Sequence, residues 1–180
     1  TQVTPIGLNG GRLADAMEDL FSAVDDEIMF GAMSMDDVLE LIEWASDIHI
    51  ARPKKSNLNP GVPSTRQVIE FQDRFLKDKA VFTGYDASEG ALYVLFMLTL
   101  AMHPDVPGMF AIDSFDHALN PRLAKRITEI FSQLIIESGK TVFMTTHNPL
   151  VLDGLNLADD RIRLFAINKA RVHANATTKI

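Results

Sequence analysis

The stretch that decides the fold is "GMFAIDSFDHALNP" (108–121), in which an apolar run ends abruptly in acids, a serine and a histidine. The run at 108–113 predicts a short buried strand, because a proline precedes it and polar residues follow it. Asn120 and Pro121 then fit the N-cap and the first position of a helix. Asp113 therefore ends a strand, and the polar residues after it either cap turns or border a metal and phosphate site.

The segments that follow extend this pattern. A helix is predicted at 120–139, a strand at 140–147, a short helix at 149–155 and another strand at 161–167. Strand, helix and strand at this spacing predict a right-handed βαβ unit in a parallel sheet. Ligands of such sheets bind beyond the carboxyl ends of the strands. We therefore expect Asp113 to share one edge of the sheet with Thr145, Thr146 and His147, which end the next strand.

The first half of the chain is less regular. Periodicity predicts helices at 10–24 and 34–46, and Ser34 is the expected N-cap of the second helix. An exposed loop is predicted at 48–65, and the segment at 66–75 suits a strand as well as a helix. A short strand at 79–85 and a buried helix at 87–103 follow. We expect residues 1–78 to form a helical segment with a linker, and residues 79–180 to carry the sheet.

Composition limits the classes of protein. The chain has 180 residues, enough for one domain, and its net charge of -7 argues against a surface that is basic all over. The basic stretch at 52–55 predicts a solvated loop, with nucleic-acid contact as the alternative. With no cysteine there is no thiolate metal site, and a reducing cytoplasm fits. The longest apolar run, 91–102, is shorter than the roughly 20 residues that cross a bilayer, so no membrane is expected.

Two stretches are candidates for phosphate binding. "ESGKT" (137–141) contains Gly-Lys-Thr, but Leu134 stands where a phosphate-binding loop needs glycine, and the stretch closes a helix rather than opening one. It is interpreted as a helix C-cap. "YDASEG" (85–90) opens a helix, so Ser88 and the backbone near Gly90 could hold an anion. The alternative there is an ordinary serine N-cap.

Three segments in this order resemble motifs of ABC-type ATPases. "ASEGALYVLFML" (87–98) resembles the signature motif, "MFAIDSFDHALNPRL" (109–123) the Walker B strand with its D-loop, and "VFMTTHNPLVLDGL" (142–155) the switch-histidine loop. The nearest branch is the OLD-like and SMC/RecF-like group of bacterial ATPases of DNA repair and anti-phage defence. "IGLNGGRLADAMEDLF" (6–21) is similar to a linker of that group, and the likeness is good over about residues 80–157.

The resemblance implies a fold and a set of roles. The fold would be the C-terminal half of a parallel-sheet P-loop NTPase core, preceded by the helical segment. Asp113 would hold Mg²⁺, and His147 would contact the γ-phosphate of ATP in its own subunit. The signature residues Ser88, Glu89 and Gly90 would reach ATP held by a second subunit. The D-loop at 116–120, with Asp116 and Asn120, would lie along the seam of that dimer.

The sequence departs from the family pattern at important places. Ser114 occupies the catalytic position that normally holds a glutamate, and serine cannot act as a carboxylate base. Asp116 is the nearest acid that could substitute. Ala87 replaces a leucine, and Asn120 replaces an acid late in the D-loop. No Walker A sequence occurs in the 180 residues, so we expect that half of the site upstream of Thr1.

Three functions are therefore weighed. The first is an ATP hydrolase that dimerises head to head around ATP and Mg²⁺ and switches an effector such as a nuclease or toxin, in phage defence or DNA maintenance. The second is a scaffold that dimerises on ATP but hydrolyses it slowly or not at all, because of Ser114. The third is a metal-dependent hydrolase that uses Asp113, Asp116, His117 and His147.

Overall fold

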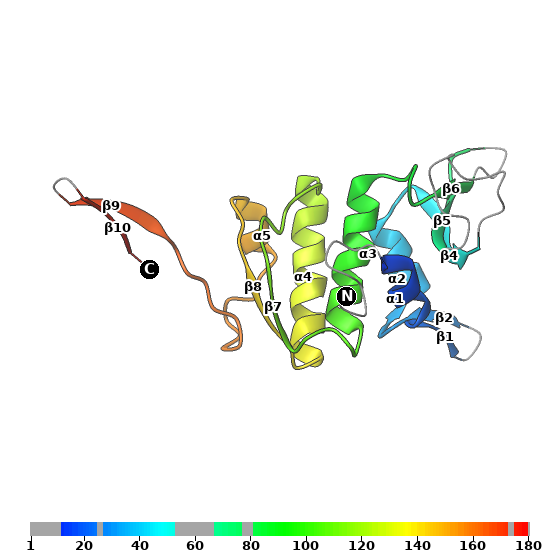
Figure 1. The fold of residues 1–180 in the computed structure, drawn as a ribbon, viewed down its shortest axis with the longest axis horizontal. Helices are drawn as coiled ribbons and strands as arrows, with labels where there is room; N and C mark the ends of the chain where they lie inside the picture. The colour runs from blue at the N-terminus through cyan, green and yellow to red at the C-terminus, as the bar shows by residue number, and fades with distance from the viewer. Residues whose placement is uncertain (1–11, 25–26, 53–66, 77–80, 173–174, 180) are drawn as a thin grey trace.

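The computed structural model describes residues 12–24, 27–52, 67–76, 81–172 and 175–179. Helices and small sheets follow one another in layers, with a parallel strand pair near one end and antiparallel strands at the other (Figure 1). The helices are α1 (Leu13–Glu18), α2 (Met35–Leu41), α3 (Glu89–Met102), α4 (Pro121–Glu137) and α5 (Pro149–Asp153). The strands are β1 (Phe21–Val24), β2 (Glu27–Phe30), β3 (Met33–Ser34), β4 (Ala45–Ala51), β5 (Val68–Asp73), β6 (Val81–Thr83), β7 (Met109–Ile112), β8 (Thr141–Met144), β9 (Asn168–Val172) and β10 (Asn175–Lys179).

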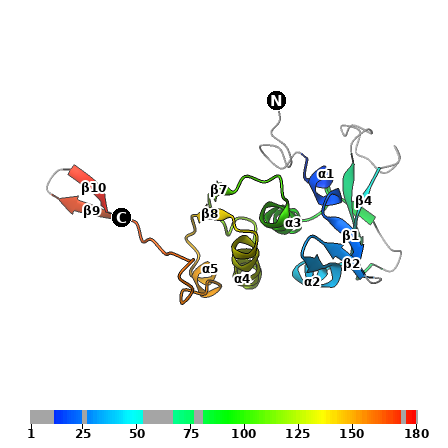
Figure 2. The same ribbon diagram turned by 90° about the horizontal axis from the view of Figure 1, so that it is seen from below.

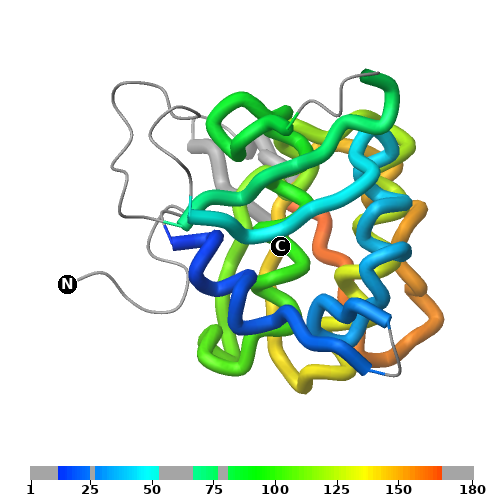
Figure 3. The backbone as a smooth tube through the Cα atoms, turned by 90° about the vertical axis from the view of Figure 1, so that its right-hand side faces the viewer, coloured from blue at the N-terminus to red at the C-terminus, as the bar shows by residue number. Residues whose placement is uncertain are grey.

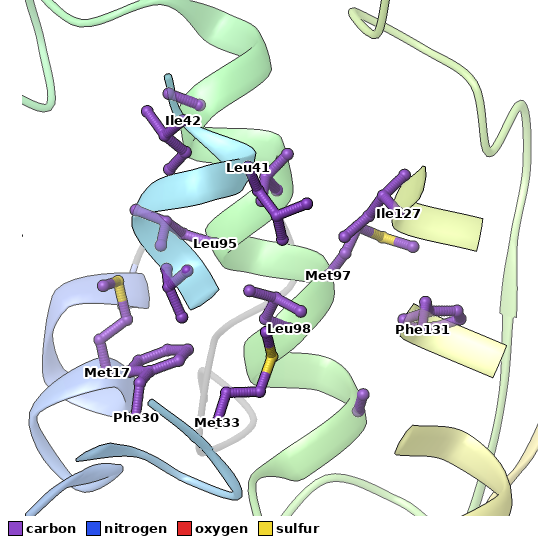
Figure 4. Packing of buried hydrophobic residues seen from close by; sticks show 14 of the residues in the cluster. Met17, Phe30, Met33, Leu41, Ile42, Leu95, Met97, Leu98, Ile127 and Phe131 are labelled. Carbon is purple, nitrogen blue, oxygen red and sulfur yellow. The ribbon is translucent and has the colours of Figure 1, made fainter. Parts of the chain in front are cut away.

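Helix α3 forms the centre of the hydrophobic core. Its side chains Val94, Leu95, Met97, Leu98 and Ala101 are completely buried, because neighbouring layers cover the helix on both sides. Figure 4 shows Met97 beside Ile127 of α4, and Leu98 on the side of Met33. The prediction of a buried helix that is apolar nearly all round is confirmed.

The predicted βαβ unit is present. Strands β7 and β8 pair in parallel, with Met109 opposite Thr141 and Ile112 opposite Met144, and α4 connects them. Asn120 caps α4 by accepting the N–H of Leu123 at 2.9 Å, as the sequence indicated.

Only one face of this strand pair is covered. Phe110, Ile112, Val142 and Met144 pack on the core, whereas Met109 and Phe143 on the other face are 63% and 60% exposed. Parallel sheets are ordinarily covered on both faces, which is why their strands are apolar throughout. The pair is therefore an incomplete α/β core.

The predicted helices of the first half extended too far. The helix expected at 10–24 ends at Glu18, because residues 21–24 pair with β2 as strand β1. The helix expected at 34–46 ends at Leu41, because β4 begins at Ala45 and pairs with β5. Figure 3 shows β4 and β5 side by side at this end of the molecule. The Ser34 cap is confirmed, since Ser34 accepts the N–H of Asp37 at the start of α2. The segment at 66–75, which the sequence left open between a strand and a helix, contains strand β5.

The strand expected at 161–167 is wrong. The Asp159 carboxylate accepts hydrogen bonds from the backbone N–H of Arg161 at 2.9 Å and from its guanidinium at 2.7 Å. These contacts fix a turn, and the chain beyond it is extended, pairs with no strand in the described residues and exposes Leu164 and Phe165. Strand pairing resumes only at Asn168, in the hairpin of β9 and β10, which lies away from the other layers in both views (Figure 1, Figure 2).

Strand pairing and hydrophobic contacts both connect residues on the two sides of the boundary expected at residue 78. β6 pairs with β5 across it, and one hydrophobic cluster includes both Phe71 and Leu95. The division into 1–78 and 79–180 stays a prediction. The exposed loop predicted at 48–65 is wrong at residues 48–51, because they pair with β5 as the end of strand β4 and Ile48 is buried. Residues 53–65, which include 53–55 of the basic stretch, lie outside the described residues. Within the described part of the chain, no helix is both long and apolar enough to cross a membrane.

Candidate functional site

The carboxyl ends of β7 and β8 meet, as the βαβ pattern predicted. The Thr145 hydroxyl donates to the Asp113 carboxylate and accepts the N–H of Ser114 at 2.9 Å. The Thr145 backbone N–H donates to the Ile112 carbonyl at 3.0 Å, and its carbonyl accepts the N–H of Phe115 at 2.9 Å. Every polar group of Thr145 therefore contacts the segment that carries Asp113.

Ser114 adopts an unusual backbone conformation at this junction. Its φ is 55°, in the left-handed region that costs most residues other than glycine on the order of 1–3 kcal/mol. Its carbonyl accepts the N–H of His117 at 2.8 Å, which closes a tight turn. The residue that directly follows Asp113 is therefore held in a strained turn.

Asp116 is held by a second threonine. The Thr146 hydroxyl donates to the Asp116 carboxylate at 2.5 Å and accepts the N–H of Asn148 at 3.0 Å. Asp116 also faces Tyr93, whose pKa is raised to about 12, first by burial and then by the negative charge of Asp116. Adjacent threonines thus hold the two acids that the sequence singled out.

The residues at the start of α3 contact other parts of the same chain. Ser88 is its N-cap and accepts the N–H of Ala91 at 3.2 Å, while Glu89 contacts His117 at 3.2 Å. A side chain on Gly90 would place its Cβ 2.7 Å from the carbonyl oxygen of Ala118. Glycine is therefore required because the backbone of the 116–120 loop passes there, not only for the approach of a ligand.

The predicted site residues fall into two groups. Ser88, Gly90 and Asn120 line a cavity of about 900 Å³ between α2 and the first turns of α3 and α4. Asp113 and the residues around it follow the ends of β7 and β8, and they do not line this cavity. The cavity also carries Trp44, Arg122, Lys125 and Arg126 and the acids Glu40, Glu43 and Glu129, so its charges balance.

His147 follows β8 and is exposed. His117, by contrast, contacts Glu89 and packs edge-on against Tyr93 with ring centroids 6.3 Å apart. No group of three or more histidine, aspartate or glutamate side chains gathers at metal-binding distance among the described residues. The set of Asp113, Asp116, His117 and His147 expected for a metal-dependent hydrolase is therefore not assembled.

The Gly-Lys-Thr stretch is a helix-end structure, as interpreted from the sequence. Gly139 has a φ of 68° just past the end of α4. The Lys140 ammonium donates to the carbonyls of Ala101 at 2.6 Å and His103 at 3.0 Å, at the end of α3. Burial lowers the pKa of Lys140. Sequence reasoning missed this cap, because nothing in the local pattern places Lys140 beside α3.

The residues at the strand ends fit part of a magnesium and nucleotide site. Mg²⁺ is usually held by one or two carboxylates together with substrate phosphates, so a single exposed Asp113 with one oxygen turned to Thr145 is a suitable ligand. The phosphates themselves need a cradle of backbone amides, and no Walker A sequence is present in the 180 residues. The sequence therefore offers Asp113 as a suitable carboxylate but contains no Walker A cradle for the phosphates.

Fold and site together define an incomplete core of the P-loop NTPase class. A protein-family model described as "AAA domain, putative AbiEii toxin, Type IV TA system" matches residues 12–153. The chain belongs to this family of AAA-type ATPases, and membership implies nucleotide binding. No curated protein and no solved structure matches the chain significantly.

Proposed function

We propose that the chain is part of an ABC-type ATP-binding and hydrolysing module of the OLD-like and SMC/RecF-like group. The observation that carries the proposal is the Asp113 carboxylate at the end of β7, held by the Thr145 hydroxyl at the end of the parallel neighbour β8. In this position Asp113 would hold Mg²⁺. His147, exposed three residues beyond β8, would contact the γ-phosphate.

The module would close head to head around ATP. Ser88, Gly90 and Asn120 line one cavity, whereas Asp113 and Ser114 belong to the strand ends. In a dimer, one ATP would contact the strand-end residues of one chain and the cavity residues of the other. In this dimer, Glu89 would reach the ATP of the second chain with Ser88 and Gly90, and Asp116 would lie along the dimer seam.

Polypeptide outside these 180 residues would supply the phosphate-binding loop. The sequence contains no Walker A pattern, and the outer face of β7 and β8 is left exposed at Met109 and Phe143. A further strand at an edge of this pair and a helix on its outer face would complete the core and bring backbone amides to the end of β7. Closure would then switch an attached effector in phage defence or DNA maintenance in the cytoplasm, with nucleic acid as a further partner.

A second candidate function is an ATP-dependent scaffold that hydrolyses ATP slowly or not at all. Ser114 has no carboxylate to orient water, and Asp116, the acid two residues further on, is already bound by Thr146. In this case ATP would still close the dimer, and opening would depend on nucleotide exchange.

Dimerisation of the assembly that contains the phosphate-binding loop tests the proposal. Light scattering after size exclusion should show a dimer with ATP and Mg²⁺ and a monomer without nucleotide. Ser88→Arg should abolish the dimer, and Ser22→Arg, on an exposed position of β1, should not. A dimer that survives Ser88→Arg would refute the shared site. Phosphate release from ATP at rates typical of the class would exclude the scaffold function. No release of phosphate would favour the scaffold function.

A further inference from the structure

Thr145 is bonded to the Asp113 segment more completely than strand pairing requires. A strand residue in a parallel pair contributes its backbone N–H and carbonyl to the neighbouring strand. Thr145 does this with Ile112 and Phe115, and its hydroxyl then adds a donor bond to Asp113 and an acceptor bond from Ser114. One hydroxyl therefore holds both a carboxylate and the amide next to it.

The two hydroxyl bonds support each other. A hydroxyl has one proton, so donating it to Asp113 leaves the oxygen lone pairs to accept the Ser114 N–H. The same contacts hold Ser114 in its left-handed conformation, with a φ of 55°. Without the hydroxyl, the amide at this strained position would lose its partner and the carboxylate would be free to rotate.

We propose that Thr145 is a positioning residue that fixes the Asp113 carboxylate and the Ser114 turn for a divalent cation. With one Asp113 oxygen turned to Thr145, the other oxygen is presented in a single direction. This inference rests on the proposed function for the cation, but the fixing of Asp113 and Ser114 is measurable without nucleotide.

Two variants of Thr145, which directly follows β8, form a matched pair. Thr145→Val keeps the side-chain shape and removes both hydroxyl bonds, and Thr145→Ser keeps the hydroxyl. Thr141→Val is the control, because Thr141 is exposed on the same face of β8 and its N–H bonds to Gly108 as that of Thr145 does to Ile112. No side-chain hydrogen bond of Thr141 is present in the described structure.

Nuclear magnetic resonance of the labelled chain tests the proposal. We expect one χ1 rotamer of Asp113 in the wild type and rotamer averaging in Thr145→Val. We also expect the Ser114 amide to exchange about tenfold faster in Thr145→Val, the size of one hydrogen bond. Thr145→Ser should restore both readouts, and Thr141→Val should leave them unchanged.

Addition of Mn²⁺ then separates this inference from the proposed function. Broadening of the Asp113 and Ser114 resonances should need several-fold more Mn²⁺ in Thr145→Val than in the wild type, and should disappear in Asp113→Asn. The rotamer and exchange results could agree with the proposal while Mn²⁺ still broadens the resonances in Asp113→Asn. That outcome would refute the metal role of Asp113 and would leave the positioning role of Thr145 supported.

Several results would overturn the positioning role itself. One is a Thr145→Val chain with an unchanged Ser114 exchange rate and one Asp113 rotamer. Another is Thr141→Val accelerating exchange as much as Thr145→Val. Should Thr145→Val fail to fold by circular dichroism, averaged Asp113 couplings in the wild type would be sufficient to overturn it.

Discussion

At the scale of single residues, Gly90 and the carbonyl of Ala118 show how closely α3 meets the 116–120 loop. A Cβ at Gly90 would lie 2.7 Å from that carbonyl oxygen, so Gly90→Ala must push the loop away. We predict that the variant lowers the free energy of unfolding by about 1–3 kcal/mol, the usual cost of overpacking.

Chemical denaturation checks this, with Gly108→Ala as the control, because a Cβ at Gly108 would meet nothing within 4 Å. Equal midpoints for the two variants would contradict the close approach at Gly90.

Tyr93 offers a residue-scale test that depends on pH. The chain has two tyrosines, so in a Tyr85→Phe background the absorbance of tyrosinate reports Tyr93 alone. We predict a pKa of about 12, raised from 10.0 by burial and by Asp116. Since the folded chain keeps this proton longer than the unfolded chain, the contribution of Tyr93 to stability is full below pH 10.0 and is lost as the pH rises through about 12.

Asp116→Asn removes the charge and should bring the Tyr93 pKa part of the way back. A Tyr93 pKa that does not respond to Asp116→Asn would show that Asp116 lies elsewhere.

The sequence predicted the position of Asp113 at the end of a strand, but it did not predict the hydrogen bonds of that residue. The end of an apolar run identified Asp113, because a buried strand must stop where charge begins. The sequence placed Thr145, Thr146 and His147 at the same edge, but it could not single out the Thr145 hydroxyl as the partner, because that depends on the register between β7 and β8. The contact of Lys140 with the end of α3 could not be predicted either, because it depends on how two segments distant in the sequence pack.

At the scale of elements, α4 depends on its N-cap. Asn120 accepts the N–H of Leu123 at 2.9 Å, at the start of the 17-residue helix that joins β7 to β8. We predict that Asn120→Ala costs about 1 kcal/mol of stability, and that Asn120→Asp, which keeps the acceptor, costs much less.

Thermal unfolding measures the stability of both variants. Asn156→Ala, at an exposed position after α5, is the control and should have no measurable effect. An Asn120→Ala chain as stable as this control would show that the cap is not formed.

The elements that were predicted well are those whose pattern is local and long. α3 is a long segment that is apolar nearly all round, α4 has one apolar face at helical spacing, and β7 and β8 are apolar runs between turn signals. The predicted helices at 10–24 and 34–46 extended too far because β1 and β4 are stabilised by partners elsewhere in the chain. The apolar pattern at 161–167 resembled a strand, but a strand also needs an available partner.

At the scale of the whole molecule, the exposed outer face of β7 and β8 is the most unusual feature. Met109 and Phe143 contribute little to the folded chain, because they are 63% and 60% exposed. We predict that the double variant Met109→Lys, Phe143→Lys changes the free energy of unfolding by no more than about 0.5 kcal/mol. It should also reduce self-association, because lysine on such a surface opposes edge and face pairing.

Sedimentation velocity and thermal unfolding of the 180-residue chain measure the two effects. A large loss of stability in the double variant would show that this face is covered within the chain itself. That result would remove one support for a completing strand from outside.

The central claim is that Asp113 holds the Mg²⁺ of a bound nucleotide. The most direct measurement is ATP affinity with and without Mg²⁺, for the wild type and Asp113→Asn, in the assembly that carries the phosphate-binding loop. The account predicts that Mg²⁺ tightens ATP binding in the wild type by about tenfold or more, equivalent to at least one charge-assisted contact, and that Asp113→Asn removes most of this gain. An equal gain from Mg²⁺ in both proteins would contradict it.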